Sequence, residues 1–451
     1  MEKRVVIIGG GPTGLGAAYR LKELKHKNWV LLEKEQYVGG LSASVKDDLN
    51  FIWDKGGHVL FSHYKYFDDI VEKLLYRGYV EHERKAYIYC MKKWIPYPFQ
   101  NNIRHLPKDA MFESIMGLII SQQKEKNSHN FKEWIVNTFG EGIANYFMMP
   151  QNLKTWAHPL EDMDNNWIKE RISVIDPVRI LKNILYNKDD NGWGPNNKFK
   201  FPLHGGTGGL FSKFEPIFKE NLCLGKKVVK IDMANKKLAL DDDEVMDYDI
   251  LINTSPLDLF VKMMRPCAAK RGLEPHAKCL KHSSSYVVGL GLKGRCRSSK
   301  CWMYFPESNF PFYRVTYFSN YSKYNVPDSK ANWSLMCETS YSKYKKIDKT
   351  KIVNETIKGL LDSNIISDSD RKNIISTHTI DIGYSYPVPT IGRDKALKRI
   401  NLFLEDNSVY SRGRFGAWRY EIGNMDHSFM QGKEVIDKVL LDKNEITYNS
   451  K

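Results

Sequence analysis

The amino-terminal segment joins an apolar run to a glycine-rich turn and a helical pattern. Its residues RVVIIGGGPTGLGAAYRL begin with β-branched side chains, pass through three consecutive glycines, and continue from about Pro12 with Ala and Leu at helical spacing. This order predicts a buried strand, a tight turn and a helix. A second apolar run, NWVLLE at residues 28–33, predicts a second strand.

The rest of the chain divides into a helical middle and a strand-rich second half. Helical patterns dominate residues 107–190, where six side chains near one helix face are expected to pack in a core: Phe131, Trp134, Ile135, Phe139, Ile143 and Phe147. A junction rich in Gly, Pro and Asn follows. Strand-like runs then occupy residues 248–256, 283–292, 312–319 and 332–340. A strand, a loop rich in Gly and Arg, and an amphipathic helix end the chain.

Three glycines in the first turn predict a dinucleotide site. Gly9, Gly11 and Gly14 form G-x-G-x-x-G between the predicted strand and helix. The first permits the tight turn, the second lets the backbone approach a pyrophosphate, and the third lets helix and strand pack closely. Glu33, about 20 residues further on, can accept hydrogen bonds from both hydroxyls of an adenosine ribose. That acid argues against the ribose phosphate of NADP.

A second glycine turn favours FAD over NAD. The Gly39-Gly40 doublet lies where flavoproteins of the glutathione-reductase and amine-oxidase type carry such a turn. The segment DKGGHVLFSHYKYFDD, at residues 54–69, places His58 directly after two glycines and is rich in aromatic side chains. We therefore expect FAD as the dinucleotide.

The elements predict an α/β protein built on a Rossmann-like FAD-binding domain of the glutathione-reductase/amine-oxidase type. A helical insert and a domain with a mixed or antiparallel sheet complete the predicted architecture. The expected boundaries are 1–105 with 200–260 and 385–451 for a discontinuous FAD-binding domain, 106–199 for the helical substrate-binding insert, and 261–384 for the sheet domain.

Composition narrows the function classes. The chain has 451 residues, 27% of them charged, and a formal net charge of +15. Its Lys and Arg residues are spread along the chain, which favours a solvated surface or attraction of a small polyanionic substrate over nucleic-acid binding. Seven cysteines form no CxxC pair and no cluster with zinc-finger spacing. This favours a reducing compartment and no metal site.

The chain carries no pattern of export or membrane insertion. The first residues, MEKRVVIIGGG, run directly into the predicted strand, so no cleavable signal is expected. The most apolar stretch, IMGLII at residues 115–120, is too short to cross a bilayer. We therefore expect a cytoplasmic protein with no membrane partner.

With these pieces assembled, the chain resembles the UDP-galactopyranose mutases, and their eukaryotic branch more closely than the bacterial one. The resemblance covers nearly the whole length. It rests on long segments of rare sequence: GGGPTGLGAA, GGHVLFSHYKYFDD, WIPYPFQNNI, NLKTWA, KER, GWGPN, FPLHGGTGG, FYRVTYFSNYS, SYPVPT and RFGAWRYEIGNMDHSF.

The resemblance implies an FAD-dependent isomerase that interconverts UDP-galactopyranose and UDP-galactofuranose. In that family the flavin must be reduced although the net reaction changes no oxidation state. Its N5 atom attacks the anomeric carbon of the sugar, and the protein supplies positioning and electrostatics. Eukaryotic relatives accept electrons directly from NADPH, so the resemblance implies NADPH as the electron donor, and Arg84 retains a basic residue at that site.

The resemblance also assigns roles to individual residues. Gly57 and His58 match a loop that lies against the flavin, whereas Arg171 and Arg314 match arginines that bind the diphosphate; His58 and these two arginines are the expected catalytic residues. The expected FAD contacts are Gly9, Gly11, Gly14, Glu33, Gly40, Gly57, His58, Arg414 and Asn424. The other expected substrate contacts are Tyr97, Phe99, Gln100, Asn152, Trp156, Asn196, Trp302, Tyr321, Tyr386 and Tyr420.

Three residues depart from the family pattern. Gln151 stands where the family usually has Tyr, Met425 stands for a Gln beside Asn424, and Ala86 stands for a small hydroxyl residue near Arg84. The Gln151 departure concerns affinity for the nucleobase, the Met425 departure concerns flavin binding, and the Ala86 departure concerns the use of NADPH. Neither of the first two removes a group that the chemistry requires.

Three other functions stay open. A flavin amine oxidase or desaturase would share the nucleotide domain but would not need two diphosphate-binding arginines. A mutase could act on another nucleotide sugar, such as UDP-N-acetylgalactosamine or UDP-arabinopyranose. A flavin-binding scaffold without catalysis would need neither His58 nor the arginines. The sequence leaves an oligomer possible and does not fix its size.

Overall fold

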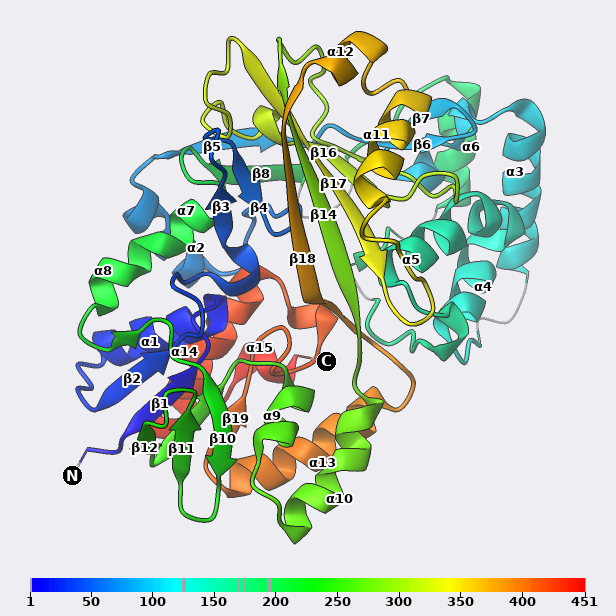
Figure 1. Cartoon of the computed structure of the whole chain (residues 1–451). Helices are drawn as coiled ribbons and strands as arrows, with labels where there is room; N and C mark the ends of the chain where they lie inside the picture. The colour runs from blue at the N-terminus through cyan, green and yellow to red at the C-terminus, as the bar shows by residue number, and fades with distance from the viewer. Residues whose placement is uncertain (1, 124–126, 169–170, 174–175, 193–196, 451) are drawn as a thin grey trace.

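The computed structural model describes residues 2–123, 127–168, 171–173, 176–192 and 197–450. Figure 1 shows a nucleotide-binding layer at one end of the molecule and a long, strongly twisted sheet that rises from it toward the helical region. Among the described helices, none is long and apolar enough to cross a membrane.

A parallel sheet forms the base of the nucleotide-binding layer. Its strands follow the order β19-β13-β1-β2-β9, with bounds Val409–Ser411, Ile250–Asn253, Val5–Ile8, Trp29–Leu32 and Leu222–Cys223. The strands β1, β2 and β13 are buried along their whole length because helices or other strands cover both faces. Both strands predicted from the first 33 residues are therefore confirmed.

Two separate cores cover the faces of this sheet. On one face, α1 (Pro12–Glu23) packs against α14 (Met425–Leu441), and Phe429, Val435 and Ile436 of α14 are fully buried there. The other face is covered by α9 (Leu257–Met263), α10 (Ala268–Cys279), α13 (Arg393–Asp406) and a small antiparallel sheet of β10 (Val228–Asp232), β11 (Lys237–Leu240) and β12 (Val245–Asp247).

The long sheet has seven strands in the order β18-β14-β17-β16-β15-β6-β7. Their bounds are Ile374–Val388, Lys281–Lys293, Asn332–Tyr341, Arg314–Tyr317, Trp302–Tyr304, Ala86–Cys90 and Lys93–Pro96. Every pair is antiparallel except β15 with β6, which is parallel. The sheet is therefore mixed, as expected.

The helical region is formed by α3 (Lys108–Gln122), α4 (Phe131–Ile143), a π-helical turn (Ala144–Met148), α5 (Met149–Trp156) and α6 (Pro177–Leu185). The side chains expected on one helix face lie in its core: Phe131, Ile135, Phe139 and Ile143 are fully buried, Phe147 is 6% exposed, and Trp134 is partly buried. Core packing, as predicted, accounts for these aromatic residues.

Shorter elements connect these layers. The strands are β3 (Ser44–Lys46) with β4 (Ile52–Asp54), and β5 (Tyr79–Glu83) with β8 (Lys198–Pro202). The helices are α2 (Lys65–Leu75), α7 (Gly208–Phe211), α8 (Glu215–Phe218), α11 (Ile352–Asp362), α12 (Asp368–Lys372) and α15 (Ile446–Asn449). Single 3₁₀ turns cover Gly40–Ser42, Phe99–Asn101, Ile103–His105, Leu160–Asp162, Ser212–Phe214, Phe318–Asn320 and Tyr420–Ile422.

The predicted fold class is confirmed, whereas the domain boundaries stay predictions. Strands β6 and β7, which lie inside the range expected for the FAD-binding domain, pair within the seven-stranded sheet through β15. This pairing links the sheet to the segment that follows the nucleotide site.

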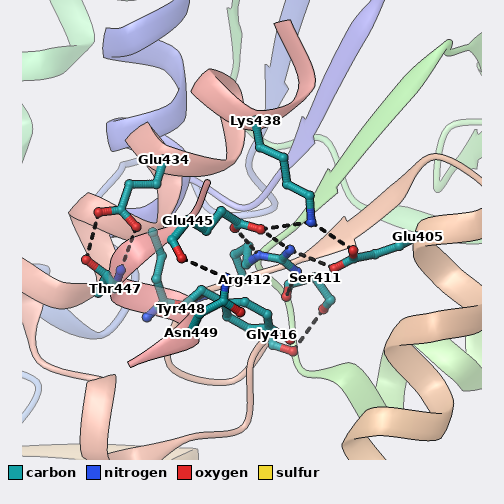
Figure 2. A network of polar contacts seen from close by, with 12 residues as sticks. Glu405, Ser411, Arg412, Gly416, Glu434, Lys438, Glu445, Thr447, Tyr448 and Asn449 are labelled. Atoms are coloured by element: carbon teal, nitrogen blue, oxygen red, sulfur yellow. Dashed lines mark hydrogen bonds and ion pairs between the residues drawn. The ribbon is translucent and has the colours of Figure 1, made fainter. Parts of the chain in front are cut away.

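A buried ion-pair network holds the carboxyl-terminal helix α15 against the end of β19 (Figure 2). The Arg412 side chain is fully buried and donates to both carboxylate oxygens of Glu445 at 2.5 and 2.6 Å and to Glu405 at 2.7 Å. The guanidinium carbon lies 3.7 Å from the ring centroid of Tyr448. Because Arg412 precedes the loop that carries Arg414, this network fixes the start of that loop.

Candidate active site

A cavity of about 940 Å³ lies between the first glycine turn and the seven-stranded sheet. Fifteen of the predicted site residues line it: Gly9, Gly11, Glu33, Gly40, Gly57, His58, Tyr97, Arg171, Trp302, Arg314, Tyr321, Tyr386, Arg414, Tyr420 and Asn424. Residues far apart in the sequence are therefore brought to one site.

The first glycine turn has the geometry that a dinucleotide needs. Gly9 has a φ of +100°, which few residues other than glycine adopt. A Cβ atom on Gly14 would lie 1.9 Å from the carbonyl oxygen of Gly9, so Gly14 permits the close packing of α1 on β1. A Cβ atom on Gly11 would meet a single protein atom within 4 Å, which leaves its backbone accessible from the cavity.

The carboxylate of Glu33 is held at the edge of this turn. The residue is 6% exposed, and its two oxygens accept hydrogen bonds from the backbone N–H groups of Gly10 (2.6 Å) and Glu35 (2.9 Å). These bonds fix the carboxylate at the cavity wall, where a ribose can donate to its remaining lone pairs. The turn and this acid fit the adenosine part of FAD.

We expect Glu33→Gln to weaken FAD binding about tenfold, because one charged hydrogen-bond acceptor for ribose is replaced by a neutral amide. Fluorescence titration of the apoprotein with FAD measures this change. Glu220→Gln, at an exposed acid outside the cavity, is the matched control. Equal affinity of the Glu33→Gln variant and the wild type would contradict the assignment.

The segment from Gly56 to His58 is held in a conformation that favours glycine. Gly56 has a φ of +106°. The N–H of Gly57 donates to Glu338 at 3.2 Å, and the carbonyl oxygen of Gly57 accepts from Arg314 at 3.2 Å. A Cβ atom on Gly57 would lie 3.0 Å from a nitrogen of Arg314, so this position has little space for a side chain.

His58 presents an unpaired polar atom beside the cavity. Its Nδ1 atom is buried and has no hydrogen-bond partner among the described residues, while other atoms of the residue line the cavity. Burial lowers the pKa of His58 to about 4, so the ring is neutral near pH 7. A buried ring nitrogen without a partner fits a site that a cofactor completes.

Arg314 forms a bidentate ion pair with Glu338 on the neighbouring strand β17. Its Nε and Nη2 atoms donate to the carboxylate at 2.6 and 2.7 Å, and Tyr313 donates to the same group at 2.8 Å. Although burial acts to raise the pKa of Glu338, Arg314 and Tyr313 hold it below its ordinary value. The pair is therefore ionised. The ion pair uses Nε and Nη2 of Arg314, so Nη1 stays available to a ligand in the cavity.

Arg171 and Arg414 line the cavity without a carboxylate partner among the described residues. Arg171 donates to the side-chain oxygen of Asn424 at 3.0 Å and to the carbonyl oxygen of Glu421 at 2.5 Å. Arg414 donates to the carbonyl oxygens of Ser385 and Gly423, and burial lowers its pKa. Two such cations in one cavity favour an anionic ligand.

Tyrosine rings form the wall around these cations. Each guanidinium carbon, of Arg171 and of Arg414, lies 5.4 Å from the ring centroid of Tyr420, and that of Arg414 lies 5.2 Å from Tyr386. The hydroxyls of Tyr386 and Tyr313 are 3.0 Å apart. Burial raises the pKa of Tyr386 to about 12, so its hydroxyl stays a neutral hydrogen-bond donor.

Some predicted residues do not reach the cavity wall. Phe99 is fully buried and stacks on Phe147 at 4.7 Å, and Gln100 donates to the carbonyl oxygen of Ser173. Asn152 accepts a hydrogen bond from Trp156, whose ring packs against Tyr386 and Tyr420. Gly14 serves the packing described above, and Asn196 lies outside the described residues. The substrate roles of these side chains stay predictions.

The structure also shows the surroundings of the residues that depart from the family pattern. Gln151 is buried and donates to the carbonyl oxygen of Tyr313 at 3.3 Å. Met425 lines the cavity at the start of α14. Ala86 is 6% exposed at the start of β6, close to the retained Arg84, which is 8% exposed and has its guanidinium carbon 5.0 Å from the ring centroid of Tyr97.

Sequence reasoning did not identify Glu338 or Tyr304. Tyr304 lines the cavity, with its ring centroid 5.6 Å from that of Tyr97. Glu338 is 2% exposed and is the charged residue of a strand that is otherwise uncharged and mostly buried. A carboxylate inside a buried strand needs a cationic partner. The position of Glu338 in the sequence could therefore have predicted a buried ion pair.

Among the residues that the structure describes, His63, Asp426 and His427 form a cluster of potential metal ligands next to the cavity. The Asp426 carboxylate accepts hydrogen bonds from His63 at 2.8 Å and from His427 at 3.0 Å. These bonds satisfy the carboxylate without an ion. The expected absence of a metal stays a prediction.

The comparisons with known proteins agree on the nucleotide domain. Residues 7–74 match the family model of the NAD(P)-binding Rossmann-like domain. A curated relative, a probable flavin-containing monoamine oxidase A of Dictyostelium discoideum, is 31% identical over 115 residues. That match spans 25% of this chain and 25% of the relative.

Solved structures extend the similarity to the whole chain. A putrescine oxidase aligns over 98% of this chain and 99% of its own with a TM-score of 0.67, but its 13% identity shows the fold alone. The crystal structure of a reduced UDP-galactopyranose mutase covers 100% of this chain and 96% of its own, with 43% identity and a TM-score of 0.97. The chain therefore belongs to the UDP-galactopyranose mutase family.

Proposed function

We propose that the protein interconverts UDP-galactopyranose and UDP-galactofuranose without net oxidation or reduction. One observation carries this proposal: a single cavity joins the FAD-type glycine turn, the segment Gly57-His58, and the arginine and tyrosine side chains suited to a diphosphate. An amine oxidase would not require such cations. Family membership supports the same conclusion.

The protein groups divide between cofactor and substrate. Gly9, Gly11, Gly40, Glu33 and Asn424 are the proposed FAD contacts. Reduced FAD, when bound, supplies a nucleophilic nitrogen for the anomeric carbon of the sugar.

Charge in the cavity assists the departure of the diphosphate. Arg171 has no carboxylate partner among the described residues and keeps its positive charge for the substrate. Nη1 of Arg314 adds a donor, while Glu338 fixes the plane of its guanidinium. The hydroxyls of Tyr321, Tyr386 and Tyr420 add neutral donors, so developing negative charge is stabilised without a proton transfer.

His58 acts as a neutral group in this proposal. Its lowered pKa prevents the ring from placing a second positive charge beside Arg314. The unpaired Nδ1 atom is available to the cofactor, and Gly57 lets the backbone carry the ring at this position. The role of His58 in this proposal is therefore to orient the cofactor and to form a hydrogen bond with it.

Further parts of the proposal rest on the resemblance. NADPH is the proposed reductant, and Arg84 beside Tyr97 is the cationic residue assigned to it. A cytoplasmic location and the possibility of an oligomer are also carried over as proposals.

Comparing three sugars tests the proposed substrate. Reduced protein is incubated separately with UDP-galactofuranose, UDP-N-acetylgalactosamine and UDP-arabinopyranose, and products are separated by liquid chromatography. We expect kcat/KM to be highest for UDP-galactofuranose. A higher value for either other sugar would replace the proposed substrate, and turnover of none would favour the scaffold hypothesis.

A further inference from the structure

A second cavity, of about 450 Å³, lies beside α5 and away from the residues that line the first. Figure 1 shows α5 next to the lower part of β17, on the side of the long sheet that faces the helical region. The proposed isomerisation uses no residue of this cavity.

Three lysines and a histidine line the second cavity: Lys132, Lys154, Lys345 and His158. Lys154 is 7% exposed and His158 is 5% exposed, so these two belong to the protein interior. The acid in the wall is Glu161, which lies 3.9 Å from Lys132 and is more than half exposed. Basic side chains therefore outnumber acidic ones in the wall of this cavity.

The two innermost lysines have no carboxylate partner among the described residues. The Lys154 amino group donates to the carbonyl oxygens of Glu307 and Phe310, both at 2.8 Å. That of Lys345 donates to the carbonyl oxygen of Ser340 at 2.6 Å. A protonated lysine has three N–H donors, so protonated Lys345 keeps two for another acceptor, and Lys154 gains its third donor when it is protonated.

The lowered pKa values of Lys154 and Lys345 agree with the lack of a negative charge paired with either lysine in the described part of the chain. Burial and the repulsion of Lys345 lower the pKa of Lys154 to about 6, and burial lowers the pKa of Lys345 to about 8. Two like charges that share a partly desolvated cavity destabilise one another, so near pH 7 Lys345 is protonated and Lys154 is largely neutral. An anion between them would favour the protonated form of Lys154 and accept hydrogen bonds from the remaining donors.

We propose that this second cavity is a binding site for a small phosphate-class anion. Lys154 and Lys345 are its main contacts, with Lys132 nearer the entrance. Most of the wall area is apolar, with Met149, Leu153 and Tyr344 among its residues, so the anion can carry a small organic group. Orthophosphate is the simplest probe of this class.

The site is connected to the first cavity through α5. Lys154 and Trp156 are two positions apart and so lie about 200° apart around the helix. Trp156 packs against Tyr386 and Tyr420, which line the first cavity.

The test measures thermal unfolding of the full chain with and without orthophosphate, at matched ionic strength set by chloride. Saturating UDP is present to occupy the arginines of the first cavity. We expect phosphate to raise the melting temperature of the wild type and of Lys346→Met, an exposed neighbouring lysine outside the cavity. Lys345→Met should require at least tenfold more phosphate for the same shift.

Comparison of variants separates site binding from the general stabilisation that phosphate salts produce by exclusion from protein surfaces. An equal phosphate shift in Lys345→Met and wild type, or no shift in the wild type, would overturn the proposal. Lys345→Glu supplies the missing counter-charge and should raise the melting temperature without phosphate. A lower melting temperature for that folded variant would also overturn it.

Discussion

Replacing Arg171 by alanine is expected to lower kcat/KM for UDP-galactofuranose by a factor on the order of 10²–10³. The guanidinium has no carboxylate partner among the described residues, so its charge is available to the diphosphate. Loss of two charge-assisted hydrogen bonds costs about 3–4 kcal/mol, which corresponds to that factor. Steady-state assays with reduced enzyme measure it.

Two further variants define the role of Arg171. Arg171→Lys keeps the positive charge but loses the planar pair of donors, so it should recover only part of the activity. Arg179→Ala, on α6, removes an exposed arginine that pairs with Asp190, and it should leave kcat/KM unchanged. Equal kcat/KM for Arg171→Ala and wild type would exclude a diphosphate role.

Replacing Arg412 by methionine is expected to lower the free energy of unfolding by about 3–5 kcal/mol. The change removes the bidentate partner of Glu445, which is 1% exposed, and leaves Lys438, 3.1 Å away, as the cation beside this carboxylate; breaking a buried pair in this way is costly. Urea unfolding followed by circular dichroism measures the change. Arg265→Ala breaks an exposed pair with Asp232 and should cost less than about 1 kcal/mol. A loss that small for Arg412→Met would contradict the anchoring role.

The nucleotide-binding end of the molecule was predictable because its determinants are local. The strand, the turn and α1 follow one another within the first 23 residues, and each has its own pattern. The residues that depend on long-range contacts were less accessible. Arg314 was found through a motif, yet its partner Glu338 sits on another strand, and nothing in the local sequence pairs them.

The family motifs located side chains better than they described their contacts. Phe99 belongs to a matching segment, yet it stacks on Phe147 of the helical region and does not reach the cavity wall. This packing depends on where the π-helical turn places Phe147. The second cavity likewise joins α5 to a loop near Lys345, so no sequence pattern indicates it.

The most direct test of the account is product analysis with the flavin in two redox states. UDP-galactofuranose is incubated with the holoprotein, once with oxidised FAD and once after reduction by dithionite, and the nucleotide sugars are separated by chromatography. We expect UDP-galactopyranose from the reduced protein only, with no oxidised sugar product. Equal conversion by oxidised protein, or no conversion by reduced protein that retains FAD, would contradict it.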